Sequence, residues 1–156
     1  MLLWRMRAAA ALRFKENERD VFRQLLRQSS AELSRDIFRQ LAEMDRSHVS
    51  RLRLMAEGGP ADLDEEAAHA LRMLTERAEA ARDEAGAVQL GLDLKRQACE
   101  FYLDLSAAAD NAFERHFYRQ LADEERESLL CLLECQEYLS DPPAYFSLKE
   151  RVSLDG

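Results

Sequence analysis

The sequence predicts an all-α protein, and three observations support this class. The chain of 156 residues contains only 5 Gly and 3 Pro, fewer turn residues than an all-β fold requires. Ala, Leu, Arg, Glu and Gln, which are strong helix formers, dominate its interior. Hydrophobic residues make up 47% of the chain, which is enough for the core of one domain and too many for a disordered segment.

Four long helices are expected from the spacing of apolar residues and from the breakers between them. In chain order they cover about residues 8–28, about 34–57, a stretch that ends before 110, and about 112–139. Gly58-Gly59-Pro60 stops the second helix, because glycine caps helix ends and proline cannot continue them. The prolines at 142–143 follow the fourth helix in the same way. Residues 61–86 are interpreted as a helical crossover segment, which can fuse with the third helix.

The lengths of the connections predict how the helices pair. Only a few residues join the first helix to the second and the third to the fourth, and short links make neighbouring helices antiparallel. The middle link, of about 25 residues, is long enough to cross the bundle. The prediction is a four-helix bundle of two helical hairpins with a long, partly helical crossover. We expect residues 1–140 to form this bundle and residues 141–156 to form a C-terminal tail that packs on it or extends from it.

An internal repeat supports the two hairpins. Residues 38–46 of the second helix match residues 118–126 of the fourth at an offset of 80. A weaker match pairs residues 18–21 with residues 95–98 at an offset of 77. Because neither hairpin can bury its apolar stripe alone, we expect the two to pack together about a pseudo-twofold axis.

Each of the four predicted helices carries an ionisable residue in the middle of its apolar stripe. These residues are Glu18, Asp45 with His48, Lys95, and Glu125. A buried charge is costly unless it is paired or bound to metal, so we expect these side chains to meet at one depth in the bundle. Glu16 stays open as an alternative to Glu18. We prefer Glu18, because the helical neighbours of Glu16 include Arg13 and Arg19, which indicate a solvent-facing side.

Together these motifs resemble the rubrerythrin branch of the ferritin-like di-iron carboxylate proteins. That family places a Glu on each of two helices and a Glu-x-x-His motif on each of the other two. Residues 45–48 resemble one such motif with Asp for Glu, and residues 125–128 resemble the other with Ser for His. Glu18 resembles the first single Glu, and Lys95 stands where the second belongs. No paired CxxC motifs follow, so the resemblance implies that the rubredoxin-like electron-transfer module is absent.

The departures from the family pattern bear on metal binding. The metal ligands that the resemblance implies are Glu18, Asp45, His48 and Glu125, with Glu125 bridging two irons. A second iron would depend on Lys95 and Ser128, but an ammonium group has no lone pair and a hydroxyl is a poor ligand for iron. The expectation is therefore at most one iron or other divalent ion. Two readings stay open: Lys95 is a buried counter-ion in a metal-free core, or it bends outward and leaves a one-metal site.

Three functions are compatible with this pattern, and no catalytic residue is assigned in any of them. The first is a metal-handling or oxidative-stress redox protein of rubrerythrin type, which would use an external redox partner. The second is a metal-free structural or partner-binding module in which Lys95 closes the site. The third is an intact di-iron oxidoreductase or peroxidase in which Glu16 or Glu100 supplies a missing ligand.

The net charge, the length of the apolar runs and the number of cysteines indicate which partners and which compartment to expect. A net charge of -8 argues against a nucleic-acid binder that neutralises phosphates. No run approaches the roughly 20 apolar residues of a membrane span, and the first residues do not resemble a secretory signal. The odd number of cysteines, 3, favours reduced thiols in the cytoplasm. We expect a homodimer, because Trp4, residues 8–12 and the crossover carry apolar surface that remains to be covered.

Overall fold

The computed structural model describes residues 3–30, 32–56, 65–81 and 83–140, and the fold of these residues is all-α. They form five helices and no strand. The helices are α1 (Leu3–Gln28), α2 (Glu32–Ala56), α3 (Glu65–Ala80), α4 (Glu84–Ala108) and α5 (Ala112–Ser140). The expected C-terminal tail lies outside the described residues, as does the Gly-Gly-Pro break after the second helix. Within the described part of the chain, no helix combines the length and the apolar character needed to cross a bilayer.

The first helix begins at Leu3, earlier than the predicted start near residue 8. The reason is tertiary contact: Arg7, in the added turn, forms ion pairs with Glu114 at 2.6 Å and with Asp110 at 2.8 Å, and the adjacent Ala8 and Ala9 are completely buried in a small apolar cluster with Ala56 at the end of α2. Alanine has the highest helix propensity and allows two helix backbones to approach closely. The helix therefore continues past the main core to the end of its partner.

The crossover helix does not fuse with α4, contrary to the fusion that the sequence left open. Asp83 has an extended backbone (φ -132°, ψ 167°), and its carboxylate accepts a hydrogen bond from the backbone N–H of Gly86 at 2.7 Å. This N-cap satisfies one of the free N–H groups at the start of a new helix. The separate helix α3 packs against α1 and α4, and its Leu74 and Ala78 are buried in the core.

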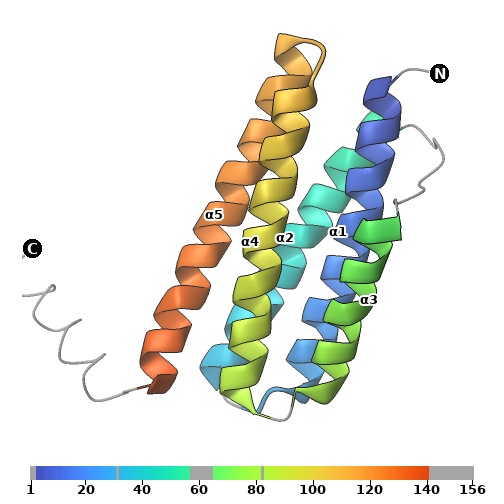
Figure 1. Ribbon diagram of the computed structural model, residues 1–156. Helices are drawn as coiled ribbons and strands as arrows, with labels where there is room; N and C mark the ends of the chain where they lie inside the picture. The colour runs from blue at the N-terminus through green and yellow to red at the C-terminus, as the bar shows by residue number, and fades with distance from the viewer. Residues whose placement is uncertain (1–2, 31, 57–64, 82, 141–156) are drawn as a thin grey trace, which may run out of the picture.

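The described helices form two hairpins, α1 with α2 and α4 with α5 (Figure 1). Each pair makes most of its helix contacts within the hairpin, and a smaller set of contacts joins α1 to α4 and α2 to α5. The turn between α4 and α5 is capped by Asn111, whose side-chain oxygen accepts the backbone N–H of Glu114 at 2.8 Å. This pairing is the one that the connection lengths predicted.

Two apolar clusters fill the interior, and polar residues lie between them on α2 and α5. The larger cluster includes Leu41 of α2 and Leu132 of α5. The smaller cluster includes Leu52 of α2 and Ala122 of α5. Asp45 and His48 of α2, and Glu125 and Ser128 of α5, are buried and fall between these residues along the chain. The fold thus sets a polar layer between the two apolar clusters.

Candidate functional site

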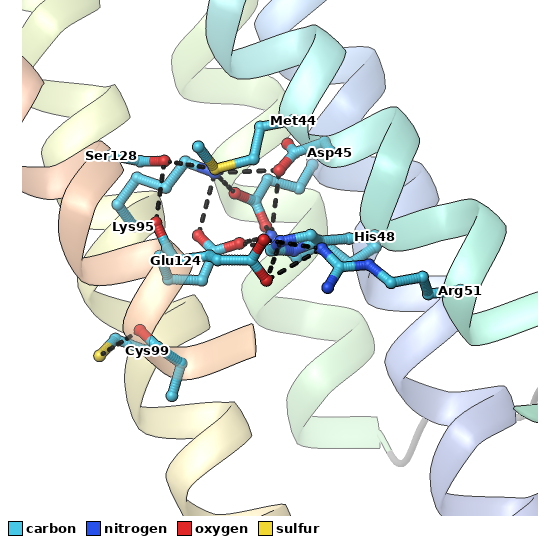
Figure 2. Close-up of polar contacts among 12 residues, drawn as sticks. Met44, Asp45, His48, Arg51, Lys95, Cys99, Glu124 and Ser128 are labelled. Atoms are coloured by element: carbon cyan, nitrogen blue, oxygen red, sulfur yellow. Dashed lines mark hydrogen bonds and ion pairs between the residues drawn. The ribbon is translucent and has the colours of Figure 1, made fainter. Parts of the chain in front are cut away.

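Six ionisable side chains meet in this layer and form what we call the ionic cluster. Its members are Lys15, Glu18, Asp45, His48, Lys95 and Glu125, and all six are 0% exposed. Figure 2 shows the polar contacts around Asp45, His48 and Lys95. The convergence of the five residues predicted from the sequence is confirmed, and the outward-bending reading of Lys95 is wrong. Lys15 is a sixth member that the sequence analysis did not identify.

Both lysine ammonium groups contact all three carboxylates of the cluster. The Nζ atom of Lys95 lies 2.7 Å from a Glu18 oxygen, 2.9 Å from an Asp45 oxygen and 2.9 Å from a Glu125 oxygen. The Nζ atom of Lys15 lies 2.8 Å from Glu18 and 3.1 Å from Asp45, and it also donates to Glu125. Each ammonium group has three protons, so each can satisfy three carboxylates at once.

The carboxylates bridge the two lysines. Glu18 offers Oε2 to Lys15 and Oε1 to Lys95, whereas Glu125 offers Oε1 to Lys15 and Oε2 to Lys95. Asp45 serves both ammonium groups through the single atom Oδ1. Its other oxygen, Oδ2, is buried and has no hydrogen-bond partner among the described residues. The result is a core of two cations surrounded by three shared carboxylates.

His48 joins the cluster on the side of Lys15. Its Nδ1 atom lies 3.1 Å from Oε1 of Glu125, the same oxygen that Lys15 contacts. Its Nε2 atom lies 3.5 Å from Glu124, whose carboxylate accepts hydrogen bonds from Arg51 at 2.9 and 3.0 Å. Burial lowers the pKa of His48, because the charged imidazolium loses its hydration. We therefore treat His48 as a neutral ring at neutral pH.

Ser128 occupies the position related by the repeat to His48, but it makes different contacts. Its hydroxyl donates to the sulfur of Met44 at 2.7 Å and lies 3.3 Å from the backbone carbonyl of Glu124 (Figure 2). The second contact is a bond to the preceding turn of its own helix. Neither contact involves a carboxylate of the cluster.

The charges of the cluster nearly cancel. Two ammonium groups face three carboxyl groups, so the fully ionised cluster carries one excess negative charge. Burial and the neighbouring Asp45 raise the pKa of Glu18 to about 7, against the opposing effect of both lysines. Burial also disfavours the charged form of Glu125, but Lys15 and Lys95 outweigh it and hold its pKa well below the ordinary value. Glu18 therefore takes up a proton more readily than Glu125.

The pKa values of both lysines rise above their ordinary value even though burial disfavours their charged forms. The field of Asp45 and Glu125 is the main compensating cause for each of them. An ammonium group that donates to three oxygens loses more by deprotonation than it gains by relief of desolvation. Both lysines are thus cations throughout the physiological range.

One part of the cluster has the composition of a metal site. Asp45, His48 and Glu125 are buried, and each offers a ligand atom within 4.8 Å of the others, so the group could hold a metal ion. Three of the four carboxylate oxygens of this group, however, already contact the ammonium groups of Lys15 and Lys95, and only Oδ2 of Asp45 does not. A di-iron centre does not fit these residues, because two cationic nitrogens lie among the carboxylates that two irons would share.

The two alternative ligands considered from the sequence lie away from the cluster. The carboxylate of Glu16 is 33% exposed and lies 3.7 Å from the guanidinium group of Arg53. Glu100 is exposed on α4. Glu18, and not Glu16, is the α1 carboxylate that faces the interior. Neither Glu16 nor Glu100 joins the carboxylates of the cluster.

A compositional signal in the sequence could have identified Lys15. Of the 22 basic residues, 19 are Arg and only three are Lys, namely Lys15, Lys95 and Lys149. Arginine supplies the surface cations of the described residues, so a lysine on an apolar helix stripe is unusual. Lys15 also precedes Glu18 by one helical turn, which places both side chains on one face.

Comparisons with known proteins do not assign this chain to a family. No family model, no curated protein and no solved structure matches the chain. The resemblance to the rubrerythrin branch stays a prediction.

Proposed function

We propose that this chain is a metal-independent helical module of rubrerythrin-like, ferritin-fold ancestry, which acts as a structural or partner-binding protein and not as an enzyme. The observation that carries the proposal is the ionic cluster, in which Lys15 and Lys95 each contact the same three carboxylates. Cations supplied by the chain itself stand among the groups that would otherwise ligate metal.

The energetics of buried charge favour this reading. Three carboxylates without cations would repel one another in a medium where their charges are poorly screened, and each would lose its hydration. Two ammonium groups provide the compensating charge and the hydrogen bonds together. Because the carboxylates are already paired in this way, the core needs no metal ion in order to be stable.

A second copy of the chain is the partner that we propose, and the structure changes which surface would contact it. The alanines at positions 8, 9 and 11 are 0% exposed, since the chain covers them itself. The side chains of Leu54 and Phe113, in contrast, are 77% and 71% exposed. Large exposed apolar side chains of this kind are typical of interaction sites. The homodimer is thus proposed on these residues and not on the alanine-rich segment.

Metal analysis of the freshly purified full chain tests the proposal. We expect less than about one tenth of an equivalent of iron, zinc, manganese or cobalt per chain by mass spectrometry. We also expect the same melting temperature with and without EDTA, because only a metal that binds the folded state raises stability. One equivalent of metal whose removal lowers the melting temperature would overturn the proposal.

A one-metal protein is the second candidate function, and the grouping of Asp45, His48 and Glu125 favours it. Such a protein would belong to the metal-handling or redox class and would depend on an external redox partner. It requires a metal ion to displace the ammonium group of Lys15 from Asp45 and Glu125. Light scattering on the same preparation reports the oligomeric state, which the two candidates share as a homodimer.

A further inference from the structure

The ionic cluster has the layout of a binuclear centre in which nitrogen atoms take the places of metal ions. Glu18 and Glu125 each span the two lysines with their two different oxygens. Asp45 spans them through one oxygen atom. A carboxylate can bridge two adjacent cations through both of its oxygens or through one oxygen. Both forms of bridging serve metal ions and ammonium groups alike.

The two cation positions differ in their surroundings. The position of Lys15 lies beside the imidazole of His48, because both contact Oε1 of Glu125. The position of Lys95 lies beside Oε2 of Glu125, and the nearby hydroxyl of Ser128 is bonded elsewhere. Imidazole suits zinc and related transition metals better than a hydroxyl does. The Lys15 position is therefore the better of the two for a metal ion.

Asp45 also has a carboxylate oxygen that is free to bind a further cation. Asp45 is 0% exposed, and its Oδ2 atom has no hydrogen-bond partner among the described residues. A buried carboxylate oxygen normally has such a partner. Together with the nitrogen of His48 and an oxygen of Glu125, Asp45 completes a set of three buried donors. Glu18 would be freed as a fourth donor if Lys15 were removed.

Charge arithmetic favours one divalent ion and not two. With Lys15 present and all carboxyl groups ionised, the cluster has one excess negative charge. If a divalent ion replaced the single charge of Lys15 and Lys95 remained, the three carboxylates would be balanced. A second divalent ion would require the loss of Lys95 as well.

We propose that Lys15 and Lys95 form a fixed two-cation centre, and that Lys15 holds closed a divalent-cation site made by Glu18, Asp45, His48 and Glu125. The inference rests on the proposed metal-independent function and extends it by naming the residue that excludes metal. The ligand class is a single divalent ion of the zinc or cobalt type. Lys95 stays in place as the permanent second cation.

The test compares Lys15→Ala with the matched variant Lys95→Ala in cobalt titrations of the full chain. Cobalt is used because its visible absorption reports both binding and coordination. We expect no binding by the parent and one equivalent by Lys15→Ala. Binding by Lys95→Ala should be at least tenfold weaker, since that position lacks the imidazole. The added change His48→Ala should weaken cobalt binding by Lys15→Ala by at least tenfold.

Folding of the variant is part of the test. If Lys15→Ala is unfolded without metal, added zinc should restore its helical circular dichroism, because the ion replaces the missing charge. Lys15→Ser is the second variant and should behave in the same way. If both variants bind no metal when folded, or stay unfolded when zinc is added, the inference is wrong.

The outcome also separates this inference from the proposed function. A metal-free parent together with a Lys15→Ala variant that binds no cobalt contradicts only the inference. A parent that is purified with one metal, and a Lys15→Ala variant that binds it equally well, contradicts both. A metal-free parent with a cobalt-binding Lys15→Ala variant supports both.

Discussion

The two helical hairpins occupy related places in the bundle but contribute different chemistry to its centre. At the offsets of the repeat, Glu18 of α1 corresponds to Lys95 of α4, and His48 of α2 corresponds to Ser128 of α5. Lys15 corresponds to Leu92, which is 1% exposed and purely apolar. Each hairpin thus supplies one lysine, but from a different position of the repeat. The two hairpins share a helical arrangement, but their charged residues occupy different positions of the repeat.

The difference makes the two hairpins electrostatically dependent on each other. The α1–α2 hairpin brings one lysine and two carboxylates, whereas the α4–α5 hairpin brings one lysine and one carboxylate. Lys15 reaches across to Glu125, and Lys95 reaches across to Glu18 and Asp45. A buried ionic network that crosses between substructures ties their relative positions together. We therefore expect the hairpins to unfold as one cooperative unit.

Removal of Lys95 should break this dependence most severely. Lys95→Ala leaves three buried carboxylates with a single ammonium group, and loss of one partner of a buried ion network costs roughly 3–5 kcal/mol. Urea denaturation at pH 8 measures the free energy of unfolding. Arg96→Ala, at the next position and exposed, is the matched control and should cost less than about 1 kcal/mol. Equal effects for both variants would refute the role of Lys95 as an internal counter-ion.

The second-largest effect is expected in how the stability of the Glu18→Gln variant changes with pH. Glu18 has a pKa of about 7 in the folded chain and an ordinary value of 4.5. Between these pH values the folded state binds more protons than the unfolded state, so the contribution of Glu18 to stability falls as the pH rises. Gln cannot ionise, so the variant does not lose this contribution. Its stability relative to the parent should therefore rise by roughly 2–3 kcal/mol between pH 5 and pH 8.

The difference in stability between Glu18→Gln and the parent separates the titration of Glu18 from that of His48. His48 acts in the opposite direction, since its lowered pKa makes stability fall as the pH drops below 6.5. His48 is present in both proteins, so its contribution largely cancels when the two unfolding curves are subtracted. A difference that is flat from pH 5 to pH 8 would show that Glu18 does not carry the extra proton of the cluster.

The repeat-related residues His48 and Ser128 should also differ in how much they stabilise the fold. His48→Ala removes a completely buried ring that packs edge-on against Tyr102 at 6.0 Å, and it should cost about 2 kcal/mol. Ser128→Ala removes a hydroxyl bonded to a thioether and to its own helix, and it should cost less than about 1 kcal/mol. Thermal and urea unfolding of the two variants test the ratio. A cost for Ser128→Ala that matches His48→Ala would mean that the two halves are equivalent after all.

The smallest effect is expected at the edge of the cluster. The pair of Arg51 and Glu124 is about one third exposed on both sides, and surface ion pairs contribute little. Arg51→Ala should change the free energy of unfolding by less than about 1 kcal/mol in low salt, and by less again in 0.5 M NaCl. A loss as large as that of Lys95→Ala would place this pair within the essential network.

Much of the site could be predicted from periodicity, and the omissions have identifiable causes. A charged residue in the middle of an apolar stripe must be buried in a bundle, so the positions of Glu18, Asp45, His48, Lys95 and Glu125 followed from spacing alone. Lys15 was missed because Glu18, one helical turn later on the same stripe, already accounted for a buried charge on the first helix. The pairing of hairpins also followed from connection lengths. The early start of α1 was not predicted, because the ion pairs of Arg7 with Glu114 and Asp110 are tertiary contacts.

The choice between metal and ammonium could not be made from periodicity. Buried carboxylates are stable only when cations compensate their charge, but the helical pattern does not indicate whether those cations are metal ions or ammonium groups. Only the distances from Lys15 and Lys95 to each oxygen show that all three carboxylates are already shared. Long flexible side chains choose their direction through tertiary contacts, which local spacing does not specify.

The most direct test of the two-cation centre is lysine-selective nitrogen-15 NMR of the parent protein, because the chain contains only Lys15, Lys95 and Lys149. We expect two ammonium signals with slowed hydrogen exchange at neutral pH, one of which disappears in Lys15→Ala and the other in Lys95→Ala. Both signals should stay in the charged form above the ordinary lysine pKa of 10.5, since the carboxylates raise the two pKa values. Lysine signals that all exchange at the rate of exposed side chains and titrate near 10.5 would contradict the two-cation centre.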